Sequence, residues 1–357
     1  MNNNNKYDLI IIGAGLTGLA LAYFLRESGK SILILEGRKR AGGRIYTKRN
    51  ANQAPQEMGA TWLSNPHTSL INILQELGIE VFEQVISDQA IYEPTPTSPP
   101  QLVQLPPNDN PSYRIANGTS TIIEKLQSYI ADDNLHLNEK VISIQEHDDH
   151  ISVQSEKAKY KANIIVSTLP PYLLNQTIGI VPSLPSSTTQ IMKQTHTWMG
   201  TSIKVSLSYA EPFWRDKGLS GTIFSAAGPL TEFYDHSDIK DKNYAMMGFI
   251  NDSYFSISKN ERLQLIMQQL NKYYGTHAQN YINYEEKIWC NDSMTSTPYK
   301  DHLLPHQNNG HAIYNQAYFN KRFYIAGAET SRTHAGYMDG AVSSAKDISQ
   351  RINNLQA

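Results

Sequence analysis

The chain has 357 residues, which is enough for about two domains with separate hydrophobic cores and argues against a fibre or a small disulfide scaffold. Its 31 basic and 33 acidic residues leave a formal net charge of −2, which gives no electrostatic reason to expect nucleic acid or an anionic membrane as a partner. The single cysteine, Cys290, cannot form an intramolecular disulfide or a cysteine-rich metal site. Because the sequence also lacks a signal-peptide pattern and an apolar run of about 20 residues, we expect a cytoplasmic protein that binds no membrane.

The N-terminal residues predict a βαβ unit. Residues 8–12 form a short run that is apolar after its first residue, which is typical of a strand buried on both faces of a parallel sheet. Apolar side chains recur at helical spacing over residues 16–24, and Gly29 follows where the helix end needs a residue that tolerates left-handed dihedrals. Residues 32–35 then read as the second strand.

Two stretches farther along predict a small antiparallel meander and a return to the first sheet. Residues 140–144 and 150–153 are strand-like and are separated by the polar turn EHDD. The apolar run at residues 163–168 is followed closely by two consecutive prolines, which prevent its continuation. We expect this run to rejoin the sheet that the N-terminal unit begins.

A proline-rich segment and an aromatic-rich region complete the chain's organisation. Residues 93–111 hold seven prolines in 19 residues, so this segment cannot be a regular helix or a central strand and is predicted to be a loop. The loop is either an exposed linker or a lid over a ligand entrance. Residues 176–288 contain a strand-like run at 203–209 and a helical pattern at 261–274, and we interpret them as a second domain inserted into the first.

A phosphate-binding motif lies between the first predicted strand and helix. This G-x-G-x-x-G motif comprises Gly13, Ala14, Gly15, Leu16, Thr17 and Gly18. Gly13 permits a tight turn, Gly15 lets a pyrophosphate approach the backbone, and Gly18 lets the helix pack closely on the strand. Glu36 closes the second strand, where a carboxylate accepts hydrogen bonds from ribose hydroxyls. These residues fit NAD and FAD equally.

The residues after Glu36 separate the two cofactors. Residues 38–47 read RKRAGGRIYT, and here the sequence resembles the flavin-containing amine oxidase family of monoamine and polyamine oxidases. The resemblance implies that Gly42, Gly43 and Arg44 lie along the FAD pyrophosphate, with the arginine contributing charge.

The resemblance continues to the C-terminus. Residues 57–62, EMGATW, are similar to the family segment beside the flavin ring, and Val141 lies in a run similar to the strand that contacts the adenine end. The stretches FYIAGAET at 323–330 and GYMDGAVSSA at 336–345 resemble a family signature, whose second part begins a helix aimed at the flavin. Beyond the glycine motif and Glu36, the residues that the resemblance assigns to FAD binding are Gly37, Arg38, Gly42, Gly43, Arg44, Gly59, Ala60, Thr61, Trp62, Val141, Trp289, Gly327, Glu329, Tyr337, Met338 and Ala341.

The resemblance also implies a fold and its division along the chain. We expect an α/β protein with a Rossmann-like FAD-binding domain, made of a parallel sheet and a small antiparallel meander, and an inserted α+β substrate domain, as in amine oxidases and glutathione reductase. The FAD-binding domain is expected at residues 1–85, 113–175 and 289–357. The substrate domain is expected at 176–288, with the proline-rich segment 86–112 at its edge.

Three residues match the family's catalytic site. Lys204, within a strand-like apolar run, resembles the lysine that holds a water near flavin N5 and assists reoxidation by O2. A lysine in such a run is costly to bury without a partner. Tyr299 and Tyr337 match the two walls of an aromatic cage that accepts the amine between its faces. Pro298 stands where monoamine oxidases of mammals have a flavin-bonded cysteine, so the FAD is expected to be non-covalent.

The sequence thus predicts an FAD-dependent amine oxidase that uses O2 and releases H2O2. Its substrate would be a primary or secondary amine, oxidised to an imine and then hydrolysed to a carbonyl product. Two alternatives remain open at this point: an FAD-dependent dehydrogenase, desaturase or amino-acid oxidase on the same scaffold, and a flavin-binding module without catalysis. The oligomeric state is not readable from the sequence, and a homodimer is compatible with it.

Overall fold

Strand β1 (Lys6–Ile12) lies at the centre of the first sheet of the computed structural model, which describes residues 6–216 and 219–355. It pairs in parallel with β2 (Ile32–Leu35) and with β13 (Lys159–Ser167). Helix α1 (Leu16–Phe24) connects β1 to β2, so the predicted βαβ unit is confirmed. The strand suits its central place because its apolar side chains are buried on both faces.

The first sheet combines a parallel part with an antiparallel meander. Its remaining strands are β10 (Leu135–His136), β11 (Val141–Glu146), β12 (Ile151–Ser155), β14 (Gly179–Val181), β20 (Ala317–Tyr318) and β21 (Phe323–Ile325). The first half of β13 pairs antiparallel with β12, and its second half pairs in parallel with β21. The predicted meander and the predicted return of residues 163–168 to the first sheet are both confirmed.

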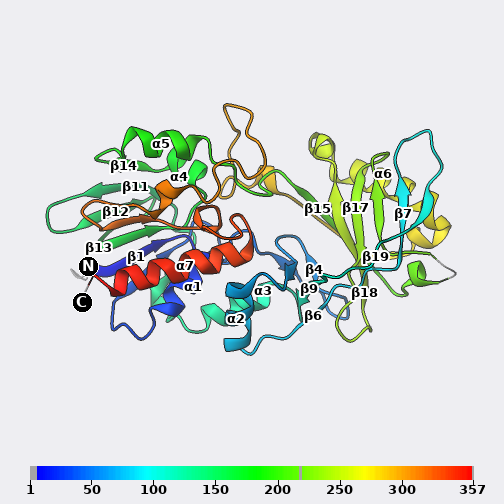
Figure 1. Cartoon of the computed structure of the whole chain (residues 1–357), viewed down its shortest axis with the longest axis horizontal. Coiled ribbons are helices and arrows are strands. Elements are labelled where there is room, and N and C mark those ends of the chain that lie inside the picture. The colour runs from blue at the N-terminus through cyan, green and yellow to red at the C-terminus, as the bar shows by residue number, and fades with distance from the viewer. Residues whose placement is uncertain (1–5, 217–218, 356–357) are drawn as a thin grey trace.

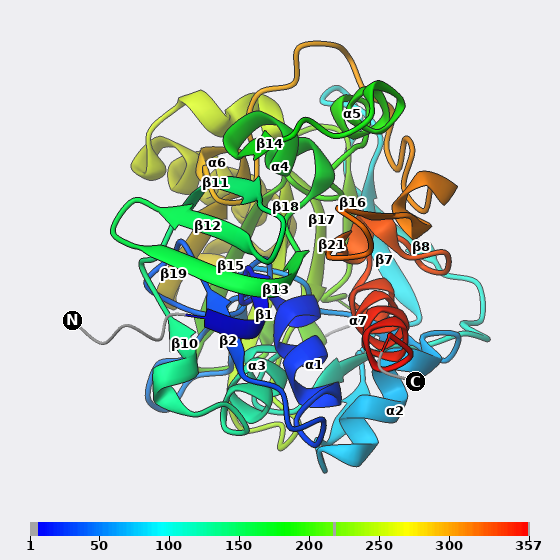
Figure 2. The same ribbon diagram turned by 90° about the vertical axis from the view of Figure 1, so that its left-hand side faces the viewer.

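Helices cover both faces of the first sheet (Figure 2). They are α2 (Thr68–Glu76), α3 (Ser120–Gln127), α4 (Pro171–Thr177), α5 (Ser186–Lys193) and α7 (Met338–Asn353). Leu9 and Ile11 of β1 point into the core shared by α1, α7, α2 and α3. Ile10 and Ile12 point to the opposite core, to which α4 and α5 contribute. The helix predicted near Gly336 is confirmed as α7.

The second half of the molecule is built on a separate sheet with its own core (Figure 1). In spatial order its strands are β19 (Tyr281–Ile288), β15 (Ile203–Tyr209), β18 (Tyr244–Ile250), β17 (Leu230–Asp235), β16 (Ile223–Ser225), β7 (Gln89–Glu93) and β8 (Gln101–Gln104). Helix α6 (Lys259–Tyr274) packs Ile266 and Leu270 against this sheet. The strand predicted at 203–209 and the helix predicted at 261–274 are both confirmed.

The proline-rich segment is only partly a loop. Gln101–Gln104 forms the edge strand β8, which pairs antiparallel with β7, so the prediction of a loop throughout residues 93–111 is wrong. The four residues are free of proline, and an edge strand needs hydrogen bonds on one side only. None of residues 93–111 lines the large cavity described below, which favours the linker over the lid.

Short strands connect the two halves. They are β3 (Thr47–Lys48), β4 (Gln56–Glu57), β5 (Leu63–Ser64), β6 (Val81–Glu83) and β9 (Ser112–Ile115). The predicted domain limits stay a prediction, although the pairing of β14 with β11 keeps residues 179–181 in the first sheet. The second sheet resumes only at Ile203. Among the helices of residues 6–216 and 219–355, none has both the length and the apolar character to cross a membrane.

Candidate active site

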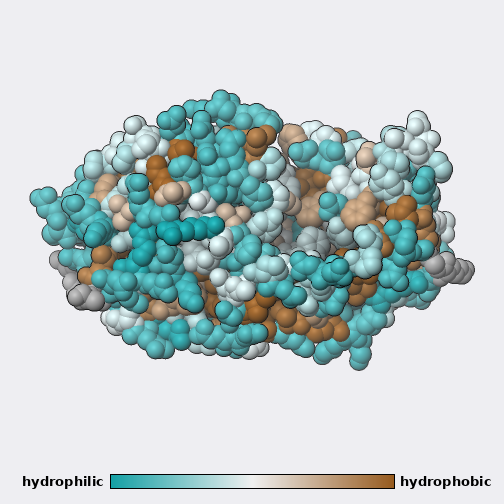
Figure 3. All heavy atoms as spheres, viewed as in Figure 1, coloured by the Kyte–Doolittle hydropathy of each residue, from teal (hydrophilic) through white to brown (hydrophobic). Residues whose placement is uncertain are grey.

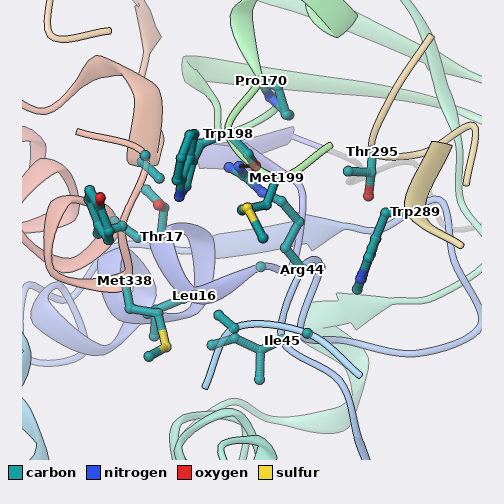
Figure 4. Close-up of a pocket in the computed structure, with 18 of the residues that line it drawn as sticks. Leu16, Thr17, Arg44, Ile45, Pro170, Trp198, Met199, Trp289, Thr295 and Met338 are labelled. Carbon is teal, nitrogen blue, oxygen red and sulfur yellow. Dashed lines mark hydrogen bonds between the residues drawn. The ribbon is translucent and has the colours of Figure 1, made fainter. Parts of the chain in front are cut away.

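A cavity of about 1120 Å³ extends from the ends of β1 and β2 in the first half to β15 and β18 in the second. Figure 3 shows the surface hollowed between the halves, and Figure 4 shows Trp198 and Trp289 facing the cavity from different sides. The predicted site residues that line it are Gly13, Gly15, Leu16, Thr17, Glu36, Gly37, Arg38, Gly43, Arg44, Gly59, Ala60, Thr61, Trp62, Val141, Lys204, Trp289, Tyr337, Met338 and Ala341. Those outside its wall are Ala14, Gly18, Gly42, Tyr299, Gly327 and Glu329. The volume exceeds the range of about 300–1,000 Å³ typical of small-ligand pockets, a size that suits a ligand as large as a dinucleotide.

Glycines form a backbone cradle at the first end of the cavity. Gly13 turns the chain out of β1 with a φ of +104°, a conformation that favours glycine. A Cβ on Gly18 would lie 2.0 Å from the Gly13 carbonyl oxygen, so α1 can approach the strand only with glycine there. Gly15 lies next to the second glycine loop, and a Cβ on Gly15 would lie 3.9 Å from the Cα of Gly43, an ordinary contact distance. The two loops are joined by a hydrogen bond of 2.8 Å from Gly42 N–H to Ala14 O.

Glu36 is fixed at the end of β2 beside this cradle. Its carboxylate is 4% exposed and accepts hydrogen bonds from the backbone N–H groups of Ala14 and Arg38, each at 2.8 Å. The side chain of Arg38 donates to Asp292 at 2.8 Å, which ties this end of the cavity to the segment after β19. A carboxylate held in this way remains able to accept from ribose hydroxyls through its other lone pairs.

Arg44 crosses the middle of the cavity wall and is paired with Glu329. Two parallel hydrogen bonds of 2.5 and 2.8 Å join their side chains, and a third from Arg44 reaches Trp198 O at 3.1 Å. Glu329 is fully buried, so the ion pair neutralises a charge that would otherwise be costly. The expected charge of Arg44 toward a pyrophosphate is therefore partly balanced, and the Glu329 carboxylate is engaged with Arg44 rather than exposed to the cavity.

Lys204 lies at the other end of the cavity, on β15. Its ammonium is 2% exposed and donates to Gly59 O at 2.6 Å and to Thr61 Oγ1. The nitrogen also lies 5.2 Å from the ring centroid of Trp62 and 5.5 Å from that of Phe249, distances at which the faces of aromatic rings attract a cation. The apolar strand predicted from the sequence thus brings a single lysine into an aromatic, nearly dry part of the cavity.

Glu57 is the buried acid that accompanies Lys204. It is also 2% exposed, and its oxygens accept from Thr119 N–H and from Thr47 Oγ1. Burial lowers the pKa of Lys204 to about 7, and the charge of Glu57 opposes that decrease. Burial likewise raises the pKa of Glu57, and the charge of Lys204 opposes that increase. Burial therefore moves the two pKa values toward each other, and the attraction between the two charges limits that movement.

An aromatic stack borders the same end of the cavity, but it differs from the expected pair of tyrosines. Tyr337 stacks on His306, with ring centroids 5.6 Å apart and planes 18° apart, and His306 stacks on Trp198 at 3.9 Å. Tyr337 and Trp198 both line the cavity. Tyr299 lies behind this wall, because its hydroxyl accepts from Thr197 N–H at 2.8 Å and its ring packs on Tyr172 at 4.7 Å.

Helix α7 directs its N-terminus at the cavity. Tyr337 is its N-cap, and Met338 and Ala341 line the cavity from its first turns. Asp339 anchors this end, since one oxygen accepts from Leu70 N–H at 2.8 Å and the other bonds the His334 ring at 2.7 Å. The positive end of the helix dipole is therefore available to a group that gains negative charge.

Sequence reasoning missed several parts of this wall. Trp198 and Met199 precede β15 in a segment without a motif, and nothing local signals that they face a cavity. Glu57 does not line this cavity but accompanies Lys204, and it had one signal, because a lysine buried in a strand favours a nearby acid. Trp289, which the sequence predicts at the cofactor site, lines the cavity, and its indole N–H donates to Met58 O at 2.7 Å.

These features define a class of protein. A glycine cradle with a buried carboxylate beside it at one end, cationic side chains along the wall and a buried lysine at the other end fit a dinucleotide-dependent oxidoreductase. The open position on Gly15 and the uncapped N-terminus of α1 suit the pyrophosphate of a dinucleotide, which NAD and FAD share.

Comparison with known proteins identifies the family. The sequence matches the family described as flavin containing amine oxidoreductase over residues 16–97 and 97–353. The chain therefore belongs to this family, and it is an FAD-dependent amine oxidase. It is 23% identical to flavin-containing amine oxidase B of Homo sapiens over 98% of this chain and 86% of that protein, and 24% identical to putrescine oxidase of Kocuria rosea over 82% and 84%.

Solved structures share the fold. Cyclohexylamine oxidase from Brevibacterium oxydans superposes with a TM-score of 0.86 at 20% identity, over 98% of this chain and 99% of that chain. Putrescine oxidase bound to putrescine superposes with a TM-score of 0.83 at 21% identity, over 97% and 99%. The expected fold class, a Rossmann-like FAD-binding domain with a substrate domain, is thereby confirmed.

Proposed function

We propose that this chain oxidises a primary or secondary amine to an imine, which hydrolyses to a carbonyl product, with O2 as the electron acceptor and H2O2 as the second product. Bound FAD supplies the transfer of two electrons from the substrate C–H bond. The observation that carries the proposal is Lys204, a lysine buried to 2% exposure where the cavity enters the second half of the molecule. A flavin protein without turnover would have no need of so costly a residue.

Lys204 is proposed to assist the reduction of O2. Its ammonium is fixed by Gly59 O and Thr61 Oγ1, so it is already oriented before oxygen arrives. A fixed positive charge in a dry, aromatic site stabilises the negative charge that oxygen gains when it is reduced. The same group, with a pKa of about 7, can also hold or release a proton at physiological pH.

Tyr337 and Trp198 are proposed to orient the amine. Their rings lie 6.1 Å apart at 43°, and His306 supports both from behind by stacking. Aromatic faces exclude water and accept the N–H and C–H edges of an amine. Tyr299 is proposed to support this wall indirectly, through the ring of His196 at 5.9 Å.

The charges on the cavity wall favour an amine over an amino acid. Glu232 and Asp252 are exposed side chains that line the cavity in the second half, and they attract a cationic amine from solvent. An amino acid would need a cationic clamp for its carboxylate. Of the basic side chains on this wall, Arg38 and Lys140 lie beside Glu36, at the end assigned to the nucleotide. Arg44 is paired with Glu329, and Lys204 is bound to Gly59 O and Thr61 Oγ1.

The FAD is proposed to be held without a covalent bond to cysteine. Cys290 is the only cysteine of the chain, and it does not line the cavity. Pro298 occupies the position before Tyr299 and offers no nucleophile. The hydrogen-bonding and packing surfaces of the cradle would then supply the binding energy.

The test uses the purified holoprotein. Its visible spectrum is recorded before and after acid precipitation, and peroxide release is then measured with monoamines, diamines, polyamines and L-amino acids. Flavin in the supernatant and peroxide with amines but not with amino acids is the expected result. Turnover only with an artificial electron acceptor would contradict the assignment of O2, and peroxide with amino acids alone would contradict the substrate class.

A further inference from the structure

A second cavity lies next to the catalytic end of the large one. It has a volume of about 290 Å³, and its lining includes Glu57, Arg114 and His236. Exposed residues, among them Arg49 and Lys240, form part of its wall, so it is accessible from solvent. A polar cavity of this size holds several water molecules.

Glu57 and Lys204 connect the two cavities. Glu57 lines the second cavity and not the first, whereas Lys204 lines the first and not the second. Strands β4 and β15, which carry the two residues, pack against each other, and each side chain is 2% exposed. The charge of each group shifts the pKa of the other, so the two interact across the wall between the cavities.

Hydrogen bonds fix the side chains of Glu57 and Lys204, and each side chain keeps at least one further position for donating or accepting a hydrogen bond. Each Glu57 oxygen accepts one hydrogen bond, from Thr119 N–H or from Thr47 Oγ1, and so retains a lone pair. Two of the three ammonium hydrogens of Lys204 are directed at protein oxygens, Gly59 O and Thr61 Oγ1. The third is available to a further acceptor.

The charged neighbours of Glu57 come from several elements. They are Lys204 on β15, Arg114 on β9, Asp235 at the end of β17, His236 and Asp238 just after it, Lys240 in the following loop and Arg49 after β3. The guanidinium of Arg114 donates to Ser237 O at 2.6 Å, which fixes it beside the cavity. Burial lowers the pKa of His236 well below its usual range, so this imidazole is neutral at pH 7. Arg114 and Lys204 are therefore the cations that face Glu57 from buried positions.

The proposed reaction needs a path for protons. An amine that becomes an imine loses two electrons and two protons, one from carbon and one from nitrogen, and O2 takes up two electrons and two protons to become H2O2. In the proposed function, cofactor and substrate would occupy the catalytic end of the large cavity during turnover. A proton exchanged with solvent at that stage must pass through the protein wall.

We propose that the second cavity is the proton entrance of the active site, and that Glu57 is a positioning residue which passes protons between its water and Nζ of Lys204. The two side chains make no direct hydrogen bond to each other, so the step needs a bridging water. The carboxylic acid of Glu57 donates to that water, the water donates to the amine of Lys204, and Glu57 is reprotonated by water of the second cavity. Burial moves the two pKa values toward each other, which brings donor and acceptor close in free energy. This inference rests on the proposed function, because the proton that Glu57 passes is one that O2 takes up when it is reduced to H2O2.

The test compares the holoenzyme with its Glu57→Gln variant in two measurements. The first follows the ¹³Cε resonance of Lys204 against pH, assigned with Lys204→Met. Since the Glu57 carboxylate raises the pKa of Lys204, its loss is expected to lower the midpoint of this titration by about one pH unit or more. The second measures the two half-reactions by stopped flow.

The half-reactions are expected to respond differently. Reduction of the flavin by substrate without oxygen should change less than about twofold in Glu57→Gln. Reoxidation by O2 should be about tenfold slower at pH 8, because a midpoint lower by about one pH unit removes most of the remaining ammonium form of Lys204. Lys240→Gln removes a charge from the wall of the same cavity and should change neither measurement, and Glu57→Asp should restore part of both.

Three outcomes would overturn the inference: an unchanged Lys204 titration in Glu57→Gln, an equal slowing of both half-reactions, or a failure of Glu57→Asp to restore either signal in a folded protein. If Glu57→Gln does not fold, Glu57→Asp carries the same comparison with a smaller change in the same direction. Absence of peroxide from the wild type with every amine would reject the proposed function. The resonance titration would still test the link between Glu57 and Lys204.

Discussion

The two ends of the large cavity are built from different parts of the chain. The nucleotide end is made of backbone from contiguous segments, in which Gly13 and Gly18 fix the approach of α1 to β1. The catalytic end is made of side chains that meet from distant segments, such as Lys204, Tyr337 and Trp198. The nucleotide end should therefore be sensitive to a single added methyl group on a glycine. The catalytic end should instead be sensitive to the loss of a hydrogen-bond partner or of packing between side chains.

The largest effect is expected from a methyl group inside the cradle. Gly18→Ala places a Cβ 2.0 Å from a backbone oxygen of Gly13, so α1 must move away from the sheet. We expect a loss of more than about 5 kcal/mol of unfolding free energy, which few single substitutions cause. Chemical denaturation of the apoprotein measures it.

Gly15→Ala is the matched variant. Its Cβ would meet only Gly43 Cα, at 3.9 Å, so the apoprotein should fold with nearly unchanged stability. The methyl group would stand where the pyrophosphate approaches, and FAD affinity should fall at least about tenfold, or 1.4 kcal/mol, in a fluorescence titration. Equal stability of the two variants would mean that the close packing of α1 on β1 is not what the cradle glycines provide.

A smaller but still large effect is expected where the two ends meet, at Arg44 and Glu329. Arg44→Leu leaves the fully buried Glu329 carboxylate without its two hydrogen bonds, at a cost of about 3–5 kcal/mol. Urea unfolding at pH 7 measures this loss.

A second variant separates charge from packing at this pair. Arg44→Leu combined with Glu329→Leu removes both charges and should recover most of the lost stability. If the double variant is as unstable as Arg44→Leu alone, the packing of the arginine stem rather than the unpaired charge accounts for the loss.

The sequence was sufficient to predict the strands, the helices and the glycine turn whose structure depends on the pattern of neighbouring residues. β15 spans the residues predicted for it, because its apolar residues alternate along the strand. β1, α1 and β2 follow the predicted order, because apolar runs such as those of β1 and β2 suit strands buried on both faces. The glycine spacing predicted the cradle for the same reason, since the turn and the close approach are properties of neighbouring residues. β8 escaped prediction because its pairing with β7 outweighs the prolines that flank it.

Contacts between side chains that are distant in the sequence could not be predicted from it. The stack of Trp198 on His306 joins the loop before β15 to the segment before β20, and no periodicity links those positions. Arg44 was predicted at the site, but its bond to Glu329 depends on how the turn at residues 328–330 and the glycine loop are placed in space. Tyr299 matched the family pattern in sequence, and only the bond from Thr197 N–H places it behind the wall.

The smallest effect separates the two tyrosines. Tyr299→Phe removes the acceptor of Thr197 N–H and should cost about 1–2 kcal/mol of stability, with little change in KM for the amine. Tyr337 is 42% exposed and borders the cavity, so Tyr337→Ala should leave stability within about 1 kcal/mol while raising KM and lowering kcat/KM. Denaturation curves and initial rates of peroxide release measure both variants. A raised KM with unchanged stability in Tyr299→Phe would instead mean that this ring turns into the cavity when substrate binds, which would restore the two-tyrosine cage expected from the sequence.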